Sequence, residues 1–169
     1  GGHLIYCVSG GAALDKEIGA GMKTLGITVL EGYGMTETSP MICFTRPGDV
    51  IPGCSGLPLP CCECKIIDGE MCVKGDNVMK GYYNRPEETA ELFDENGYLH
   101  TGDLARLDEK GRVYITGRKK EIIVLSNGKN VQPVEIEFKL EKYDQFVKEC
   151  AVSYYNDKLV AVIVPQDDI

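Results

Sequence analysis

One ten-residue stretch, EGYGMTETSP at residues 31–40, combines side chains that suit a nucleotide. Two glycines flank Tyr33, and glycine lets the backbone approach a flat ligand while leaving the face of the ring open. Such a ring can stack on a base such as adenine. Thr36 offers a hydroxyl to a phosphate oxygen, and Glu37 offers a carboxylate to Mg²⁺. The alternative is a surface turn in which Tyr33 packs inward and Glu37 is solvated.

Two further polar residues could belong to the same site. Asp103 ends the segment HTGD at residues 100–103, and its two acceptor oxygens suit the vicinal hydroxyls of a ribose. Taken alone, an aspartate after a Thr-Gly turn is better explained as a cap of the next segment. Arg118 ends a predicted strand, where it either contacts ribose or phosphate or lies on the surface. Neither residue identifies a function by itself.

The first part of the chain predicts the elements that would position these residues. Residues 4–9 are typical of a buried strand, and 27–32 are β-branched and apolar like a second strand. Between them, helical spacing over 13–25 is shown by Leu14, Ile18, Met22 and Leu25. Strands joined by a crossover helix are parallel. Residues 9–12 and 31–34 therefore leave the carboxyl ends of neighbouring strands and flank one crevice, where α/β sheets bind ligands.

The remainder predicts short antiparallel strands and then a small α+β string. Asp68-Gly69 is a strong two-residue hairpin signal, and Pro86 starts a short helix over 86–93. After a strand at 122–126, Pro133 opens a helix. Its apolar face is expected to carry Ile136, Leu140, Tyr143 and Val147. A final hairpin over 149–165 completes the pattern.

Composition excludes several classes of protein. The formal net charge of −8 argues against binding to a nucleic-acid backbone, which needs an excess of Lys and Arg. No apolar run approaches the length of a membrane span, so we expect a cytoplasmic protein without a transmembrane segment.

Both ends of the 169-residue chain look cut, and we expect a piece of a longer protein.

Eight cysteines raise the question of a metal. The thiolates that could bind zinc are those of Cys54, Cys61, Cys62, Cys64 and Cys72. Adjacent Cys61 and Cys62 would point to opposite faces of an extended strand, so we favour reduced, structural cysteines. His3 and His100 form no triad or metal motif in the sequence and are expected to be structural.

Together, five blocks of the sequence resemble the adenylate-forming superfamily of acyl-CoA synthetases, peptide-synthetase adenylation domains and luciferases. The blocks occur in that family's order and are SGGAAL (9–14), EGYGMTE (31–37), GEMCVKGDNVMKGYYNRPEET (69–89), YLHTGD (98–103) and GRKKEIIVLSNGKNVQPVEIE (117–137). The last block is most similar to bacterial long-chain fatty acid–CoA ligases.

The resemblance implies an α/β fold in two parts. Residues 1–117 would be the end of a large AMP-binding domain, with a βαβ part of a parallel sheet and a small antiparallel barrel-like part. Residues 118–169 would be the start of a small, mobile α+β domain. The cysteine-rich stretch at 54–65 would fall on a barrel-like strand, which favours structural cysteines.

The resemblance also implies a two-step ligase. A fatty-acid carboxylate attacks the α-phosphate of Mg-ATP to give an acyl-adenylate and pyrophosphate, and the thiol of CoA then displaces AMP. The implied partners are ATP, a fatty acid and CoA, without nucleic acid. Peripheral contact of the parent protein with a membrane stays open.

The implied nucleotide-binding residues are Gly11, Ala12, Glu31, Gly32, Tyr33, Gly34, Thr36, Asp103, Arg118 and Gly128. Among them, Tyr33 would stack on adenine, and Asp103 and Arg118 would contact the ribose. Thr36 would touch the α-phosphate, and Glu37 would hold Mg²⁺. Gly11 and Ala12 would line the region of adenine and the acyl carbonyl, and Gly128 would lie near the pantetheine path. Lys120 would be the hinge between the two half-reactions.

The sequence departs from the family at two places. The family's phosphate loop lies upstream of the matched blocks and its adenylation lysine lies beyond them, so we expect these 169 residues in isolation to lack ligase activity. Alternatives remain: a ligase for another acid, an adenylation domain that loads a carrier protein, a non-catalytic nucleotide-binding module, and a zinc protein.

Overall fold

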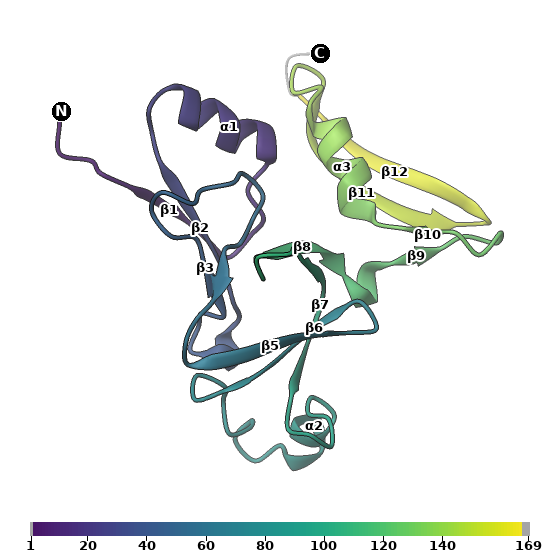
Figure 1. The fold of residues 1–169 in the computed structure, drawn as a ribbon. Helices are drawn as coiled ribbons and strands as arrows, with labels where there is room; N and C mark the ends of the chain where they lie inside the picture. Colours follow the sequence, from purple (N-terminus) through teal and green to yellow (C-terminus); the bar gives the residue numbers. More distant parts are fainter. Residues whose placement is uncertain (1, 167–169) are drawn as a thin grey trace. The chain divides into compact units, whose positions relative to one another are not determined.

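The computed structural model of the chain describes residues 2–166 and contains two compact units, 1–116 and 117–169 (Figure 1). Gly1 and residues 167–169, which the expected domain ranges include, lie outside the described part. The observed architecture is α/β, with one mixed sheet, antiparallel sheets and few helices. No helix among the described residues has the length and apolar character needed to cross a membrane.

The first unit begins with the expected βαβ arrangement. Strand β1 (Cys7–Ser9) pairs in parallel with β2 (Val29–Tyr33), and α1 (Lys16–Thr24) connects them. Asp15 starts α1 because its Oδ1 accepts the N–H groups of Glu17 and Ile18 at 2.8 and 3.0 Å. The parallel pair that the sequence predicts is thus confirmed.

The expectation of a buried strand over residues 4–9 is wrong. Strand β1 begins only at Cys7, and the side chains of Leu4, Ile5 and Val8 are 65–73% exposed. The physical reason is position: β1 is the edge of its sheet, and among the described residues β2 alone pairs with it. An apolar run predicts burial only where other elements cover it.

Two short antiparallel strands extend this sheet. Strand β3 (Cys43–Phe44) pairs with β2, and β4 (Leu57–Pro58) pairs with β3, giving the order β1-β2-β3-β4. The result is a mixed sheet whose parallel half ends at Tyr33. The chain after Tyr33 therefore has to turn back immediately to form β3.

A second, antiparallel sheet has the order β5-β6-β7-β8 and is not closed into a barrel within the described residues. Its strands are β5 (Cys62–Ile67), β6 (Glu70–Gly75), β7 (Leu99–Leu107) and β8 (Val113–Arg118). Asp68 and Gly69 have φ values of 50° and 79°, as the predicted two-residue hairpin requires. Helix α2 (Pro86–Ala90) is shorter than the expected 86–93.

The core of the first unit lies between β3 and the second sheet. Its fully buried members are Ile42, Cys43, Met71, Val73, Leu99 and Val113. Tyr33 and Met35 pack against this cluster while remaining partly exposed. The site described below therefore rests directly on the core.

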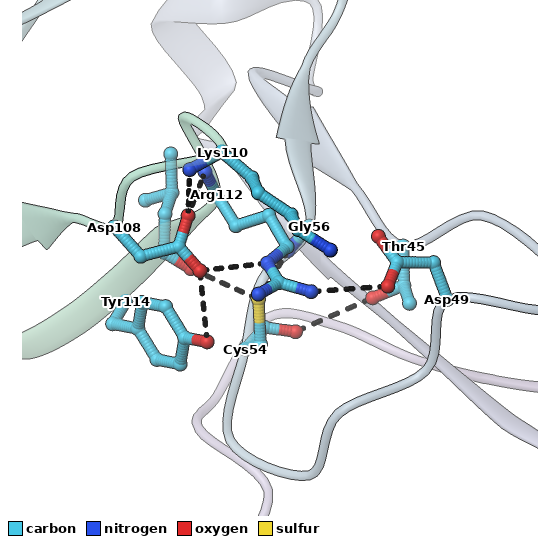
Figure 2. A network of polar contacts seen from close by, with 9 residues as sticks. Thr45, Asp49, Cys54, Gly56, Asp108, Lys110, Arg112 and Tyr114 are labelled. Atoms are coloured by element: carbon cyan, nitrogen blue, oxygen red, sulfur yellow. Dashed lines mark hydrogen bonds and ion pairs between the residues drawn. The ribbon is translucent and has the colours of Figure 1, made fainter.

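A polar network holds the loop after β3 against the hairpin of β7 and β8 (Figure 2). The guanidinium of Arg112 donates to Asp108 Oδ2 at 2.7 Å and to Asp49 Oδ1 at 3.0 Å. The main chain reinforces this attachment, since Val113 and Gly56 form an antiparallel bridge. The loop of residues 45–56 is consequently fixed in place although it contains little regular structure.

The second unit contains two hairpins and one helix. Strands β9 (Ile123–Val124) and β10 (Asn130–Val131) form the first hairpin, and β11 (Val147–Tyr155) and β12 (Lys158–Pro165) form the second. Helix α3 (Pro133–Glu141) packs against β11.

The predicted apolar face of the last helix was too long. Helix α3 ends at Glu141, so it cannot carry Tyr143 and Val147. The N–H of Phe146 donates to the carbonyl of Tyr143 at 2.8 Å, which turns the chain, and Val147 then begins β11. Helical spacing alone did not reveal this turn.

Candidate nucleotide-binding site

The sheet edge at which the sequence predicts a crevice is the edge where β1 and β2 end. Ser9 is paired with Glu31, so the segments that follow both strands leave from the same side of the sheet. Gly11 has a φ of 89°, a conformation that glycine adopts without strain, and Ala12 follows it. The structure thus brings the segment of Gly11 and Ala12 to the same sheet edge as Tyr33.

Tyr33 and Asp103 are brought together from distant parts of the sequence. The phenol of Tyr33 donates to Asp103 Oδ2 at 2.7 Å, and Asp103, in β7, is only 7% exposed. Burial raises the pKa of the phenol well above its usual range, and the negative charge of Asp103 adds to the effect. Tyr33 therefore stays protonated and acts as a donor, and two of the predicted site residues share one location.

Glycines 32 and 34 have a cause that does not involve a ligand. A Cβ on Gly34 would lie 1.9 Å from the carbonyl oxygen of Pro40, and one on Gly32 would lie 2.9 Å from the ring of Phe44. The returning chain of residues 40–44 thus requires both glycines. Their spacing around Tyr33 is explained by packing and is no evidence for a ligand on that side.

The residues after Gly34 form a single 3₁₀ turn, η1 (Thr36–Thr38). Thr38 is completely buried, and its hydroxyl donates to the carbonyl of Met35 at 2.9 Å. Thr36 is exposed, so its hydroxyl is accessible to a ligand. The turn thus contains one buried, structural threonine and one exposed threonine, and the contact of Thr36 with a phosphate stays a prediction.

Glu37 has a partner that the sequence did not reveal. The phenol of Tyr82 donates to Glu37 Oε1 at 2.5 Å, across 45 positions of the chain. This bond raises the pKa of Tyr82. The only signal in the sequence was the presence of Tyr82 inside the matched block at 69–89.

The residues present fit a magnesium ion that arrives with a nucleotide. Mg²⁺ is usually held by one or two carboxylates together with phosphate oxygens and water, not by an all-protein cage. Among residues 2–166 no group of three or more His, Cys, Asp or Glu side chains is placed to hold a metal. Glu37 supplies one carboxylate, which fits a site where Mg²⁺ is bound jointly by the protein and by the phosphates of the nucleotide.

A buried hydrogen-bond system supports Asp103. The N–H of Asp103 donates to Thr101 Oγ1 at 3.1 Å, and that hydroxyl donates to the carbonyl of Met71 at 2.8 Å. Glu70, 4% exposed, accepts the N–H of Gly102 at 2.8 Å. Side-chain acceptors from Thr101 and Glu70 thus hold the main chain at Gly102 and Asp103, which restrains the position of the Asp103 carboxylate.

Glu31 is a further buried carboxylate, at the carboxyl end of the parallel strand pair. It is 8% exposed, and its Oε1 accepts the N–H of Gly53 at 2.9 Å. Burial raises its pKa, while the bond from Gly53 lowers it in part. The backbone of Glu31 is clamped by Thr45, whose hydroxyl donates to the Glu31 carbonyl at 2.8 Å. Glu31 is therefore tied to the loop that Arg112 holds.

The other predicted residues belong to the second unit. Arg118 ends β8, Lys120 lies in the 3₁₀ turn η2 (Lys119–Glu121), and Gly128, with a φ of 79°, lies in the turn between β9 and β10. Convergence of Arg118 with Tyr33 and Asp103 stays a prediction, as do the roles of Lys120 and Gly128.

The cysteines are found mainly in packing positions. Cys61 and Cys64 stand at C-x-x-C spacing, which a zinc site could use. Three other cysteines, Cys43, Cys54 and Cys72, are at most 1% exposed and belong to the packed interior. The thiol of Cys62 lies 3.5 Å from the carbonyl oxygens of Ile42 and Leu59 and donates to the main chain. These environments are those of structural thiols.

Comparison with known proteins identifies the relatives of this chain. The family model described as "AMP-binding enzyme" matches residues 1–83. The chain belongs to the AMP-binding enzyme family. Luciferin 4-monooxygenase of Nipponoluciola cruciata is 42% identical over 149 residues, which are 80% of this chain and 27% of the relative. Peroxisomal long chain acyl-CoA synthetase 6 of Arabidopsis thaliana is 37% identical, over 100% of this chain and 26% of its own length.

Solved structures of AMP-binding enzymes give the same result. ATP-bound MatB from Rhodopseudomonas palustris has a TM-score of 0.84 at 34% identity, covering 97% of this chain and 36% of that one. The O-succinylbenzoate coenzyme A synthetase MenE from Bacillus subtilis, in complex with ATP and a magnesium ion, has a TM-score of 0.82 at 36% identity, covering 94% and 36%. The chain spans about a quarter of the length of the curated relatives it matches.

Proposed function

We propose that the intact protein containing this chain is an AMP-forming long-chain fatty acid–CoA ligase. The observation that carries the proposal is the 2.7 Å hydrogen bond between Tyr33 and Asp103, which joins two of the matched blocks. Long-chain acyl-CoA synthetases among the relatives favour a fatty acid, although the structural relatives also include ligases of other acids.

Each residue has a defined task in this proposal. Tyr33 stacks on adenine, and the carboxylate of Asp103 accepts from the ribose hydroxyls. Arg118 adds a contact to the ribose. Thr36 donates to the α-phosphate, where negative charge develops as the acid carboxylate attacks and pyrophosphate leaves. CoA then attacks the acyl carbonyl through its sulfur, and AMP departs with the electron pair of the broken C–O bond.

Glu37 would hold Mg²⁺ beside the phosphates. When bound, that ion neutralises charge on the phosphate oxygens and orients them for displacement. Gly11, Ala12 and the main chain of residues 31–34 shape the nucleotide side of the crevice. Lys120 serves as the hinge between adenylation and thioester formation, with Gly128 near the pantetheine.

The test uses the intact parent enzyme and palmitate-dependent ATP–pyrophosphate exchange, followed by thioester formation with CoA. AMP binding to the same enzyme is measured separately. Asp103→Asn keeps an acceptor for Tyr33 but loses the negative charge, and we expect the affinity for AMP to fall about 10- to 100-fold. Asp68→Asn, at an exposed turn, is the matched control. AMP binding without exchange would favour a non-catalytic module, and transfer to a carrier protein but not to CoA would favour an adenylation domain.

A further inference from the structure

The segment of residues 79–89 is attached to Glu37 at two points. The N–H of Met79 donates to the main-chain carbonyl of Glu37 at 2.7 Å, and the phenol of Tyr82 donates to its side chain at 2.5 Å. One attachment places the Cα of Glu37, and the other orients its carboxylate. The segment of residues 79–89 therefore contacts both the main chain and one carboxylate oxygen of Glu37.

Tyr82 is itself held by its own segment. Thr89 Oγ1 accepts the N–H of Tyr82 at 2.9 Å and donates to the carbonyl of Arg85 at 2.6 Å. Gly81 has a φ of 143°, and a Cβ there would lie 2.7 Å from the Cγ2 of Thr89. The turn is therefore closed around Thr89, which holds the main chain of Tyr82 independently of the contact between its hydroxyl and Glu37.

The next residue provides a natural comparison. Tyr83 has the same side chain one position further on, yet it is 91% exposed, against 41% for Tyr82. The local turn thus assigns the two tyrosines to different surroundings. A general effect of removing a tyrosine hydroxyl from this loop would be shared by both positions, whereas an effect through Glu37 is specific to Tyr82.

We propose that Tyr82 is a positioning residue for Glu37, which orients the carboxylate toward the divalent cation that accompanies ATP. The inference rests on the proposed function. An O–H···O⁻ bond of this length is charge-assisted and strong. It occupies one oxygen and restrains rotation of the carboxylate, so the other oxygen is presented in a fixed direction. Mg²⁺ needs that restraint, since it demands near-ideal octahedral geometry at about 2.0–2.1 Å.

The experiment compares Tyr82→Phe with Tyr83→Phe in the intact parent enzyme. Binding of Mn²⁺ in the presence of saturating ATP is measured by the loss of the free Mn²⁺ signal in electron paramagnetic resonance. We expect Tyr82→Phe to weaken Mn²⁺ binding about tenfold, as loss of a residue that orients a metal ligand usually does. In exchange assays the Mg²⁺ concentration for half-maximal rate rises in parallel, with the KM for the fatty acid unchanged. Tyr83→Phe leaves both unchanged.

Two further variants separate positioning from a general effect on folding. Glu37→Gln removes the charge, and in that background Tyr82→Phe is expected to have no additional effect on Mn²⁺ binding. Thermal unfolding of Tyr82→Phe and Tyr83→Phe is followed alongside. A loss of Mn²⁺ affinity that persists when Glu37 is already replaced would overturn the proposal, because Tyr82 would then act by another route.

The outcomes distinguish this inference from the function on which it rests. If the unmodified parent shows no metal-dependent adenylation, the proposed function fails. If the parent adenylates a fatty acid but Tyr82→Phe and Tyr83→Phe bind Mn²⁺ equally, only the role of Tyr82 is rejected. Tighter Mn²⁺ binding by Tyr82→Phe would show that the phenol competes with the cation, which also rejects it.

Discussion

The phenol of Tyr33 donates a 2.7 Å hydrogen bond to Asp103, a residue 70 positions further along the chain. The bond connects the carboxyl end of β2 in the mixed sheet to β7 in the antiparallel sheet. It therefore ties the predicted adenine platform to the predicted ribose acceptor within one unit. A ligand that contacts both groups would meet a surface already organised before it binds.

We expect Tyr33→Phe to lower the free energy of unfolding by about 1.5–3 kcal/mol, the usual worth of a hydrogen bond to a charged group. The substitution keeps the ring and removes the donor from a carboxylate that is 7% exposed. Urea denaturation followed by circular dichroism measures the change. Tyr83→Phe, at a 91% exposed position, should change stability by less than about 0.5 kcal/mol. Equal values for the two variants would show that the Tyr33–Asp103 bond contributes nothing measurable.

Gly34→Ala should be strongly destabilising for reasons of packing. The added methyl would lie 1.9 Å from the carbonyl oxygen of Pro40, which is main chain and cannot move aside alone. We expect a loss of about 3 kcal/mol. In Gly21→Ala, by contrast, the methyl meets nothing within 4 Å inside helix α1, and stability should rise by about 0.5–1 kcal/mol. A tolerated Gly34→Ala would contradict the tight return of residues 40–44.

The Arg112 network predicts a specific response to acid (Figure 2). Desolvation acts to raise the pKa of Asp108, but the N–H and guanidinium of Arg112 outweigh it and lower that pKa from 3.8 to about 2. A depressed carboxyl pKa contributes stability that is complete above pH 3.8 and is lost as the pH falls toward 2. The Asp108→Asn variant should therefore be less stable than the unsubstituted protein at neutral pH, and it should lose less stability as the pH falls from 3.8 toward 2.

Urea denaturation repeated between pH 5 and about 2 tests this pH dependence. Asp68→Asn, which alters an exposed turn outside the network, serves as the control and should keep the acid-dependent loss. An Asp108→Asn variant with the same pH profile as the unsubstituted chain would exclude Asp108 as its source.

Glu70 should be important for the position of Asp103 although it makes no contact with a ligand in the proposal. Its Oε1 accepts the N–H of Gly102, and His100 Nδ1 lies 3.1 Å from its Oε2. Glu70→Ala leaves the N–H of Gly102 without this acceptor, and we expect a loss of about 1–3 kcal/mol. Glu63→Ala, on the neighbouring strand with a side chain 62% exposed, should cost less than about 0.5 kcal/mol. Similar losses in denaturation experiments would refute the special role of Glu70.

Much of the fold could be predicted because its signals are local. Apolar runs, helical spacing and the Asp68-Gly69 turn identified the parallel strand pair and the first hairpin of the antiparallel sheet. The errors arose where a distant element decides the result. Residues 4–6 resemble a core strand but lie outside β1, and Val147 continues a helical spacing yet begins the next strand. Burial and helix ends depend on what packs nearby, which periodicity does not contain.

The sequence by itself determined the family, since its blocks of residue types stand in a fixed order, and it nominated Tyr33, Glu37 and Asp103. Only the tertiary structure decided that Tyr33 meets Asp103, that Tyr82 meets Glu37, and that the glycines beside Tyr33 make room for the returning chain. The physical reason is range. Residue type specifies the chemistry of a side chain, whereas its partner is chosen by folding of segments 45 and 70 positions apart.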